Sequence, residues 1–275
     1  MISLQGMSSL LGLALVDATR DRQIASIQNS AQGTREINAF RERISDIETV
    51  DQLLDDHELY TFVMKAYDLE DQIFGKAMMG KVLTSDIDDK TSLVNRLTDQ
   101  RFKDINQGMG FLPDDAGNNN TLQKIWQDEM VERFTERQFI NSQADQNETI
   151  GTVLEFRRKA SSITSGFDFL KDPELAEFIR TAVGLPQEAA GIDIDLQAAF
   201  IESKVDFEKL NSPAEIERLT LRYIAIKDAE NIDNISGNTA VQLMTAAVNA
   251  SSGGQFVPIT IDIESITQVP KGSYS

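Results

Sequence analysis

Apolar residues recur every three or four positions along most of the chain, which is the spacing of one face of an α-helix. A clear stretch places Leu59, Phe62, Val63 and Ala66 at i, i+3, i+4 and i+7. The same spacing returns, with the same kinds of side chain, at positions 175, 178, 179 and 182. The pattern predicts an all-α protein whose helices bury one face.

This similarity extends over a longer segment. A shift of 116 positions aligns residues 37–69 with residues 153–185 without a gap. The alignment contains eleven identical pairs: Phe40/Phe156, Arg41/Arg157, Ser45/Ser161, Ile47/Ile163, Leu54/Leu170, Asp56/Asp172, Glu58/Glu174, Leu59/Leu175, Phe62/Phe178, Ala66/Ala182 and Leu69/Leu185. So many matches on one ungapped diagonal are difficult to obtain by chance. They predict an internal duplication in which both segments superpose as one two-helix element.

Both segments carry the same signal for the start of a helix. Asp172 is expected to accept hydrogen bonds from free backbone N–H groups, and Pro173 suits the first helical position because it has no N–H to leave unpaired. Asp56 and His57 occupy these places in the first segment. We therefore expect His57 to be a structural surface residue at the first turn of a helix.

The helices also end at equivalent residues. Gly184 stands where a left-handed C-terminal residue is expected, and Asp68, a type that tolerates this conformation, stands at the equivalent position. Leu69 and Leu185 then follow as apolar residues that fold back on the last turn. Further on, the Arg-Leu-Thr sequence at 96–98, followed by an arginine and an aromatic residue, recurs near 218–223.

We therefore expect two related multi-helix units joined by a long central helix. Residues 113–120 form a turn-rich break, and apolar residues from 121 to 145 suggest the joining helix. The predicted division is an N-terminal segment at 1–34 that is mobile in the free protein, a first repeat unit at 35–115, a connecting helix at 116–150, a second repeat unit at 151–232, and a C-terminal helix with an extended tail at 233–275.

The two ends have apolar residues with no counterpart in the repeat. The N-terminal cluster consists of Ile2, Leu4, Met7, Leu10, Leu11, Leu13, Leu15 and Val16. An exposed patch of this kind is costly in a monomer, so it either packs on the core or is reserved for a partner. The polar segment 18–35 separates it from the repeat and favours the partner. Residues 257–263 alternate as in a short C-terminal strand, which is stable only when paired.

The charge of the chain limits the classes of partner that it can bind. With 44 acidic and 26 basic residues the formal net charge is −18, and this field repels phosphate backbones and anionic lipid headgroups. We expect no nucleic acid partner and no membrane insertion, since an apolar run of membrane-spanning length is also missing. The first residues lack the basic start of a secretory signal. The sequence contains no cysteine, which excludes disulfides and thiolate metal sites.

Residues Gly75–Val82 read GKAMMGKV and resemble a phosphate-binding loop at seven of its eight positions. The eighth needs a hydroxyl to hold Mg²⁺, and Val82 has none. The loop should also follow a buried strand, whereas this stretch lies inside an apolar helical pattern. We interpret it as close helix packing over small residues.

Acidic clusters offer two further candidates for a cation site. Asp86, Asp88 and Asp89 resemble the opening of a calcium loop, but the residues that follow do not fit it, so a solvated helix start is favoured. Asp114 and Asp115, with Asn118 to Asn120, could gather oxygen ligands, although any turn favours such residues. With a single histidine, no His-based metal cluster or Ser/His/Asp triad can form. We predict no catalytic, cofactor-binding or metal-binding residues.

Two long stretches resemble a known family. The sequences AYDLEDQIFGKAMMGKVLTSDIDDKTSLVNRLTDQRF at 66–102 and FRRKASSITSGFDFLKDPELAEFIRTAVGLP at 156–186 are similar to a bacterial family of unknown function. With the arginine-aromatic pair at 222–223, the resemblance covers most of residues 45–230. Members of this family are often encoded among alphaproteobacterial flagellar genes. The resemblance implies this context and no active site.

These observations favour a non-enzymatic structural or protein-interaction protein that serves the flagellum or its assembly. Its expected partner is another protein, with flagellar components as the first candidates. Self-association is an open alternative. The alternative is an enzyme, or a metal- or small-molecule-binding protein, with a site made of carboxylates. The predicted location is the cytoplasm, and the alternative is export by the flagellar apparatus without a cleavable signal.

Overall fold

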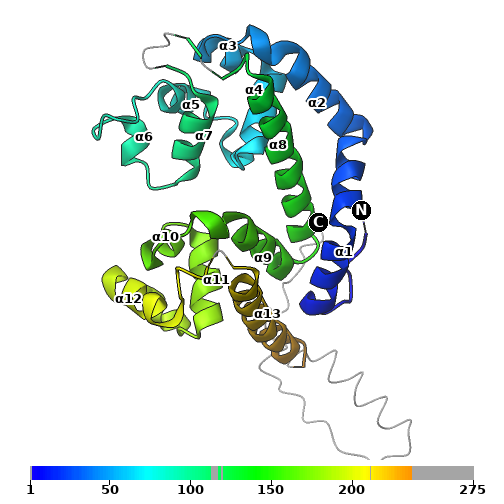
Figure 1. The fold of residues 1–275 in the computed structure, drawn as a ribbon, viewed down its shortest axis with the longest axis vertical. Helices are drawn as coiled ribbons and strands as arrows, with labels where there is room; N and C mark the ends of the chain where they lie inside the picture. Colours follow the sequence, from blue (N-terminus) through cyan, green and yellow to red (C-terminus); the bar gives the residue numbers. More distant parts are fainter. Residues whose placement is uncertain (1, 113–116, 119, 211, 237–275) are drawn as a thin grey trace, which may run out of the picture. The chain divides into compact units, whose positions relative to one another are not determined.

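A computed structural model describes residues 2–112, 117–118, 120–210 and 212–236 (Figure 1). The predicted all-α fold is confirmed, because the described residues form helices and a single isolated bridge between Phe111 and Asn118. The α-helices are α1 (Ser9–Gln28), α2 (Ala31–Arg43), α3 (Val50–Asp55), α4 (His57–Ala66), α5 (Lys76–Leu83), α6 (Leu93–Arg96), α7 (Arg101–Met109), α8 (Lys124–Ala144), α9 (Glu148–Lys159), α10 (Gly166–Leu170), α11 (Pro173–Val183), α12 (Ile194–Lys204) and α13 (Pro213–Ser236).

The chain divides into two compact units, Met1–Ile224 and Ala225–Ser275. The first unit holds α1 to α12 and the beginning of α13. Short 3₁₀ turns lie between its helices at η1 (Ile44–Asp46), η2 (Glu70–Gln72), η4 (Ala160–Ser162) and η5 (Gln187–Gly191). No helix of the described residues is long and apolar enough to cross a membrane.

The predicted helix starts are confirmed. Asp172 accepts hydrogen bonds from the backbone N–H groups of Glu174 and Leu175 at 3.0 and 3.3 Å, and Pro173 is the first residue of α11. Asp56 accepts from the backbone N–H of Leu59 at 3.1 Å. His57 is the exposed first residue of α4, as predicted.

The predicted stops are confirmed as well. Gly184 has a φ of 76°, and Asp68 has a φ of 59°, so both lie in the left-handed region. The next residue donates its N–H back to the preceding turn in both places, from Leu69 to Met64 O and from Leu185 to Arg180 O, each at 2.8 Å. This six-to-one bond is the one that closes a helix behind a left-handed residue.

Residues 37–69 and 153–185 contain the same order of elements. A long helix, a 3₁₀ turn, a short helix and a second long helix follow one another in α2–η1–α3–α4 and in α9–η4–α10–α11. The turn η4 lies 116 residues after η1, which is the offset of the sequence alignment. Superposition of the two segments as copies stays a prediction.

Beyond these segments the expected correspondence is wrong for local structure. Arg96 is the last residue of α6, and Leu97 after it is extended, whereas Arg218 and Leu219 lie inside the continuous helix α13. The extended break lets the chain turn from α6 into α7, a turn that α13 does not make. The shared Arg-Leu-Thr sequence therefore does not specify one conformation.

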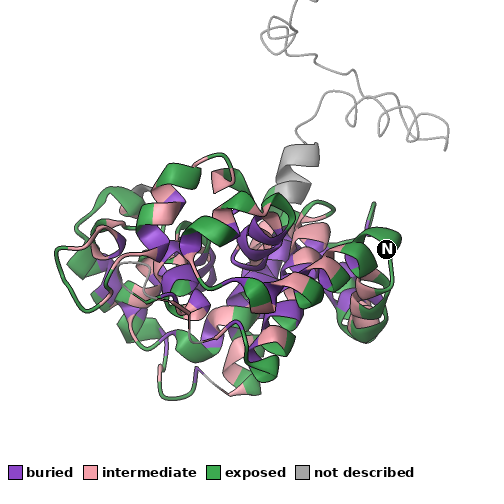
Figure 2. Ribbon diagram, turned by 90° about the horizontal axis from the view of Figure 1, so that it is seen from above, coloured by how far each residue is buried: buried purple, intermediate pink, exposed green. Residues whose placement is uncertain are grey.

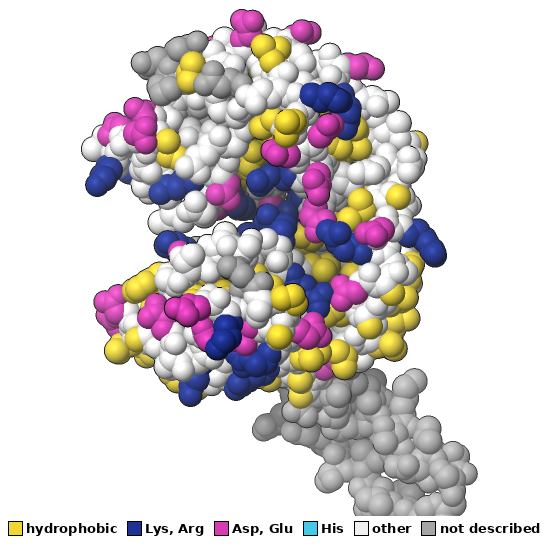
Figure 3. Space-filling view, viewed as in Figure 1, with side chains coloured by type: hydrophobic (Ala, Val, Ile, Leu, Met, Phe, Trp, Pro, Cys, Tyr) yellow, Lys and Arg dark blue, Asp and Glu magenta, His cyan; other side chains and the backbone are white. Residues whose placement is uncertain are grey.

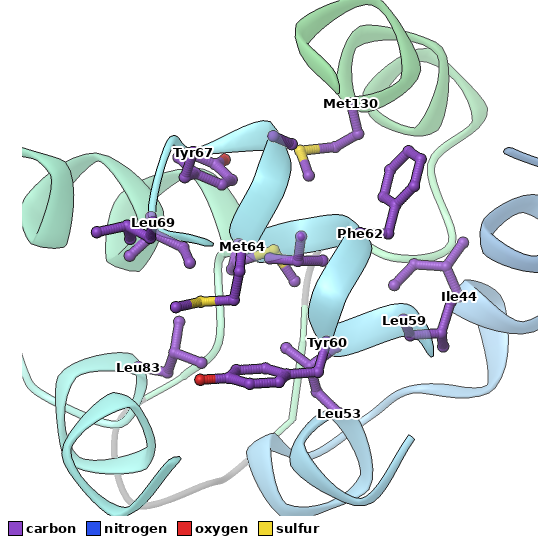
Figure 4. Close-up of a cluster of buried hydrophobic side chains, with 14 of the residues drawn as sticks. Ile44, Leu53, Leu59, Tyr60, Phe62, Met64, Tyr67, Leu69, Leu83 and Met130 are labelled. Carbon is purple, nitrogen blue, oxygen red and sulfur yellow. The ribbon is translucent and has the colours of Figure 1, made fainter. Parts of the chain in front are cut away.

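Two hydrophobic clusters form the core of the first unit, and Figure 2 shows the buried residues on the inner sides of the helices. The first cluster runs from Ile37 to Phe134, and Figure 4 shows part of it around α4. Here Phe62 stacks between Phe40 and Phe134, with both ring centroids at 4.3 Å. Such stacked pairs contribute beyond their buried area.

The second cluster has a similar aromatic centre. Phe178 of α11 stacks on Phe156 of α9 with ring centroids 4.1 Å apart, and Tyr223 of α13 lies 4.8 Å away on a tilted plane. Each cluster therefore places one aromatic residue of its second long helix between two other rings.

The predicted long helix within 121–145 is confirmed as α8, but it does more than connect. Trp126, Met130 and Phe134 are buried in the first cluster, and Phe139 and Ile140 are buried in the second. Figure 1 shows α8 beside α4 and α1, with α9 following its end. One helix thus supplies side chains to both cores.

Part of the N-terminal apolar cluster packs on the core, which is one of the two alternatives predicted for it, and mobility of the segment 1–34 stays a prediction. Leu4, Leu13 and Val16 are buried in the second cluster, and α1 packs against α8 and α9. The backbone N–H of Leu4 also donates to Gln146 Oε1 at 3.0 Å. Burial accounts for these three side chains of the cluster, whereas Met7, Leu10 and Leu11 of the same cluster are exposed. The predicted strand at 257–263 lies outside the described residues.

Candidate functional site

A cavity of about 560 Å³ lies along α8, where α1, α4, α7 and α9 approach it. Its apolar wall is made by Ala66, Tyr67, Trp126 and Met130, which also belong to the first cluster. Figure 3 shows this face hollowed, with Lys and Arg and Asp and Glu side chains gathered along the hollow. The volume lies within the range of small-molecule sites.

The polar wall of the cavity combines two kinds of charge. Its charged residues are Arg20, Glu129, Glu132, Arg133, Glu136, Arg137 and Arg158. Most of these arginines have a carboxylate partner: Arg20 pairs with Glu136, while Arg137 and Arg158 pair with Glu155 behind the wall. The pairs fix these guanidinium groups in place.

Arg137 and Glu155 form the buried part of this network. The two side chains are 6% and 2% exposed, and an Arg137 Nη to Glu155 Oε2 distance of 2.7 Å joins α8 to α9. Arg137 also lies 3.3 Å from a carboxylate oxygen of Asp68. On its own helix, Glu155 receives two hydrogen bonds from Arg158 and an ion pair from Lys159 at 2.6 Å. A buried charge needs partners of this kind.

The electrostatics of Glu155 follow from these contacts. Burial acts to raise the pKa of its carboxyl, but hydrogen bonds from Arg158 and the charges of Arg137 and Lys159 outweigh burial and hold the pKa well below its ordinary value. The carboxylate in turn raises the pKa of Lys159 against the opposing effect of burial. Glu155 is therefore ionised and serves to hold the arginines, not to exchange a proton.

Tyr67 is the polar residue of the apolar wall. Burial raises the pKa of its hydroxyl to about 12, against the nearby charge of Arg133, so the phenol is protonated at neutral pH. The hydroxyl lies against Gly108, where a Cβ atom would stand 1.9 Å from it. Trp126 Nε1 donates to the Gly108 carbonyl at 2.7 Å and fixes the indole beside it. Figure 4 shows Tyr67 near Met130, which also lines the cavity.

Arg133 is held differently from the other arginines. Its guanidinium lies over the Tyr67 ring, 4.5 Å from the centroid, which is a cation–π contact. No carboxylate of the described residues forms an ion pair with it. Its N–H donors are therefore free to meet a ligand that enters the cavity.

The candidate chemistry suggested by the sequence lies elsewhere. Gly75 caps the start of α5, and Gly80 faces Leu54, whose Cδ1 would be 3.2 Å from a Cβ at this glycine. Gly80 is thus a position of close helix packing, as expected. His57 is exposed at the start of α4.

The acidic candidates form turns. Asp86 and Asp89 accept hydrogen bonds from the backbone N–H groups of Asp88 and Thr91, at 2.9 and 2.8 Å. The expected helix start is wrong here, because α6 begins only at Leu93. In the other cluster Asp114 and Asp115 lie outside the described residues, whereas Asn118 and Asn120 donate to the Met109 and Gly108 carbonyls. The described residues contain no group of three side chains placed to hold a metal ion.

The sequence interpretation missed the cavity residues. One signal was present: Arg137 lies three residues after Phe134 and seven after Met130, so the helical period places a charge on the buried face of α8. A buried arginine requires an acidic partner. The sequence does not identify that partner as Glu155, since the two residues lie on different helices.

Comparisons with known proteins agree with the helical fold. The chain is similar to a protein from Agrobacterium tumefaciens with an X-ray crystal structure, at 27% identity and a TM-score of 0.73, over 84% of this chain and 97% of that chain. A search of curated proteins gives no match. A family model described as "Protein of unknown function" matches residues 66–216, more than half of the chain. The chain therefore belongs to this family of unknown function, DUF1217.

Proposed function

We propose that the protein is a non-enzymatic interaction protein that binds another protein through one face of α1. The observation that carries the proposal is a group of exposed apolar side chains, Met7, Leu10 and Leu11, which are 37%, 51% and 59% exposed. Leu10 and Leu11 lie in the first turn of α1, and Met7 lies just before its N-cap residue Ser8. We name these three residues the α1 patch.

The α1 patch is distinct from the buried residues of the same helix. Leu13 and Val16 are 3% and 0% exposed and contact the second cluster, so α1 is already anchored without the patch. A helix that uses one apolar side for the core and keeps another in water is suited to a helix-in-groove or helix-packing contact. Such a contact needs no ordering of α1 itself, which lowers the entropic cost of binding.

The charge of the molecule supports a protein as the occupant. A net charge of −18 repels the anionic surface of a membrane, which would otherwise be an alternative for an apolar patch. The sequence resembles a family that is often encoded among flagellar genes, and on this ground we propose a flagellar component as the partner. A partner with an apolar surface fits the patch, and the net charge of −18 favours a partner that also carries basic residues.

The test is a double substitution, Leu10→Gln with Leu11→Gln, in the full chain. Flagellar proteins of the native host are offered to the purified variant and to wild type, and binding is quantified for each. We expect unchanged helicity and melting, since both residues are exposed, and at least about tenfold weaker binding if both are anchors. The matched control is Leu122→Gln with Ile125→Gln, two residues that are each 75% exposed, the first just before α8 and the second in its first turn. Equal losses in both variants would contradict the assignment to α1.

The cavity beside α8 supports a second candidate, a small-molecule-binding protein. The observation in its favour is the combination of a preformed volume with an arginine that has no carboxylate partner among the described residues. A ligand that binds the native state must raise the melting temperature, so thermal melting with and without ligand separates the two candidates.

A further inference from the structure

We propose that the cavity along α8 is a binding site for a small monocarboxylate with an apolar body, held by Arg133 and Tyr67. This inference is independent of the α1 patch. It rests on what the wall of the cavity offers: one free cationic group, one unpartnered hydroxyl and an apolar surface beside them.

The number of available positive charges sets the charge of the ligand. Arg20 pairs with Glu136, and Arg137 and Arg158 share Glu155, so each of these guanidinium groups already has a carboxylate partner. Arg133 alone among the arginines of the wall has no such partner in the described residues. One free guanidinium suits one carboxylate, which it can bind through two parallel hydrogen bonds.

The hydroxyl of Tyr67 adds a second donor. The residue is 5% exposed and lines the cavity, and its hydroxyl has no hydrogen-bond partner among the described residues. A ligand oxygen in the cavity could accept a hydrogen bond from this hydroxyl. Because Arg133 stacks on the same ring, the cation and the hydroxyl are held on one rigid support.

The apolar side of the cavity would contact the apolar body of the ligand. Ala66, Trp126 and Met130 are 3%, 9% and 2% exposed, so they present a small, fixed apolar wall. An aromatic or branched body would pack there, while water would be displaced from apolar surface. Inorganic phosphate has no such body and carries more charge than one guanidinium can balance. Glu129 and Glu132 also line the cavity, and they repel a dianion more strongly than a monoanion.

The chain carries its own reporter for this site. Trp126 is the single tryptophan of the sequence and lines the cavity, so its fluorescence responds to a ligand that enters. The probe is phenylacetate, and phenylacetamide is its uncharged match. We expect a saturable change with phenylacetate and binding at least about tenfold tighter than with phenylacetamide, since hydrogen bonds to a charged group contribute more than neutral ones. Inorganic phosphate should bind more weakly than phenylacetate.

Substitutions of Arg133 and Tyr67 test whether these residues bind phenylacetate. Arg133→Gln should abolish the preference for phenylacetate over phenylacetamide, and Tyr67→Phe should weaken phenylacetate binding about threefold to tenfold while keeping the ring. Arg22→Gln removes the same charge from an exposed position on α1 outside the cavity, and it should leave binding unchanged. Melting curves of all three variants confirm folding, and the ligand-induced rise in melting temperature gives a second readout.

Three results would overturn the inference. These are equal affinity of wild type for phenylacetate and phenylacetamide, an undiminished preference in Arg133→Gln, and the absence of any saturable fluorescence or melting change with phenylacetate. Tighter binding of phosphate than of phenylacetate would also overturn it, because the apolar wall would then contribute nothing.

Discussion

Residues 37–69 and 153–185 contain the same order of helices and the same stop, yet they use the left-handed residue differently. Gly184 takes this conformation without a side chain, and a Cβ there would lie 3.5 Å from Arg222 Nη2. Asp68 takes it with a carboxylate that lies 3.3 Å from Arg137 and 4.0 Å from Arg101. The first segment thus adds an electrostatic contact at a position where the second keeps only backbone geometry.

A second difference concerns the buried network. Glu155, which holds Arg137 and Arg158, has Ala39 at the equivalent position of the first segment, 116 residues earlier. The acidic residue at the centre of the charged wall therefore belongs to one segment only. Two stretches with similar helices and similar aromatic centres can differ in the few positions that build a site.

The aromatic centres give the largest expected effects. Phe62→Ala and Phe178→Ala should each lower the free energy of unfolding by about 3–5 kcal/mol, because each removes a fully buried ring that stacks on a neighbour. Urea denaturation followed by circular dichroism measures both. A cost below about 1 kcal/mol for either one would show that the two centres are not equivalent.

A substitution in the buried ion-pair network around Glu155 should have the second largest effect on stability. Glu155→Gln is expected to cost about 3 kcal/mol, because it leaves Arg137 buried with only the partly exposed Asp68 as a carboxylate partner. The control is Ala39→Gln, which introduces a glutamine at the equivalent position on α2. We expect α2 to tolerate this glutamine, because glutamine is a good helix former. Chemical denaturation at constant pH compares the two, and equal costs would contradict the assigned role of Glu155.

The same carboxylate predicts a pH dependence. Because the folded pKa of Glu155 is held below its ordinary value of 4.5, the ionised form stabilises the fold above that pH. As pH falls below 4.5, the unfolded chain takes up a proton first, and the stabilisation is lost progressively toward the folded pKa. Wild type should therefore lose stability more steeply with acid than Glu155→Gln, as measured by melting temperature from neutral to acidic pH. Parallel curves would be evidence against this linkage.

The left-handed stop should give a smaller effect. Gly184→Ala is expected to cost about 1 kcal/mol and Gly184→Val somewhat more, because a side chain resists a positive φ and a branched one resists it further. Space is not the cause, since a Cβ would meet only Arg222 Nη2 at an ordinary distance. Gly184→Asn is the matched control and should cost less than alanine, because asparagine tolerates this conformation. The order of the three melting temperatures is the test.

The smallest effect is expected at Asp68. Asp68→Asn keeps a residue that tolerates the left-handed conformation and removes the charge that faces Arg137 and Arg101. The carboxylate side chain is 37% exposed, so solvent screens the interaction and the cost should be about 0.5–1 kcal/mol. Added salt should reduce the difference from wild type, and a difference that is independent of salt would point to packing instead.

The sequence predicted those features that neighbouring residues determine. The caps at Asp56 and Asp172 and the stop at Gly184 depend on a few adjacent positions, and they were identified correctly. The packing of Leu4 in the second cluster depends on residues far along the chain, and no local pattern reveals it. The cavity belongs to this second kind, because its wall combines residues from five helices.

The long separation between Leu4 and its partner also affects how the chain folds as it is made. Leu4 bonds to Gln146, which is 142 residues away, and its apolar neighbours on α1 pack against α8 and α9. At the usual pace of synthesis these partners leave the ribosome on the order of ten seconds later. During that interval α1 has no core to cover its apolar side, so the newborn N-terminus is open to chaperones. Docking of α1 is then a late step that the second cluster must precede.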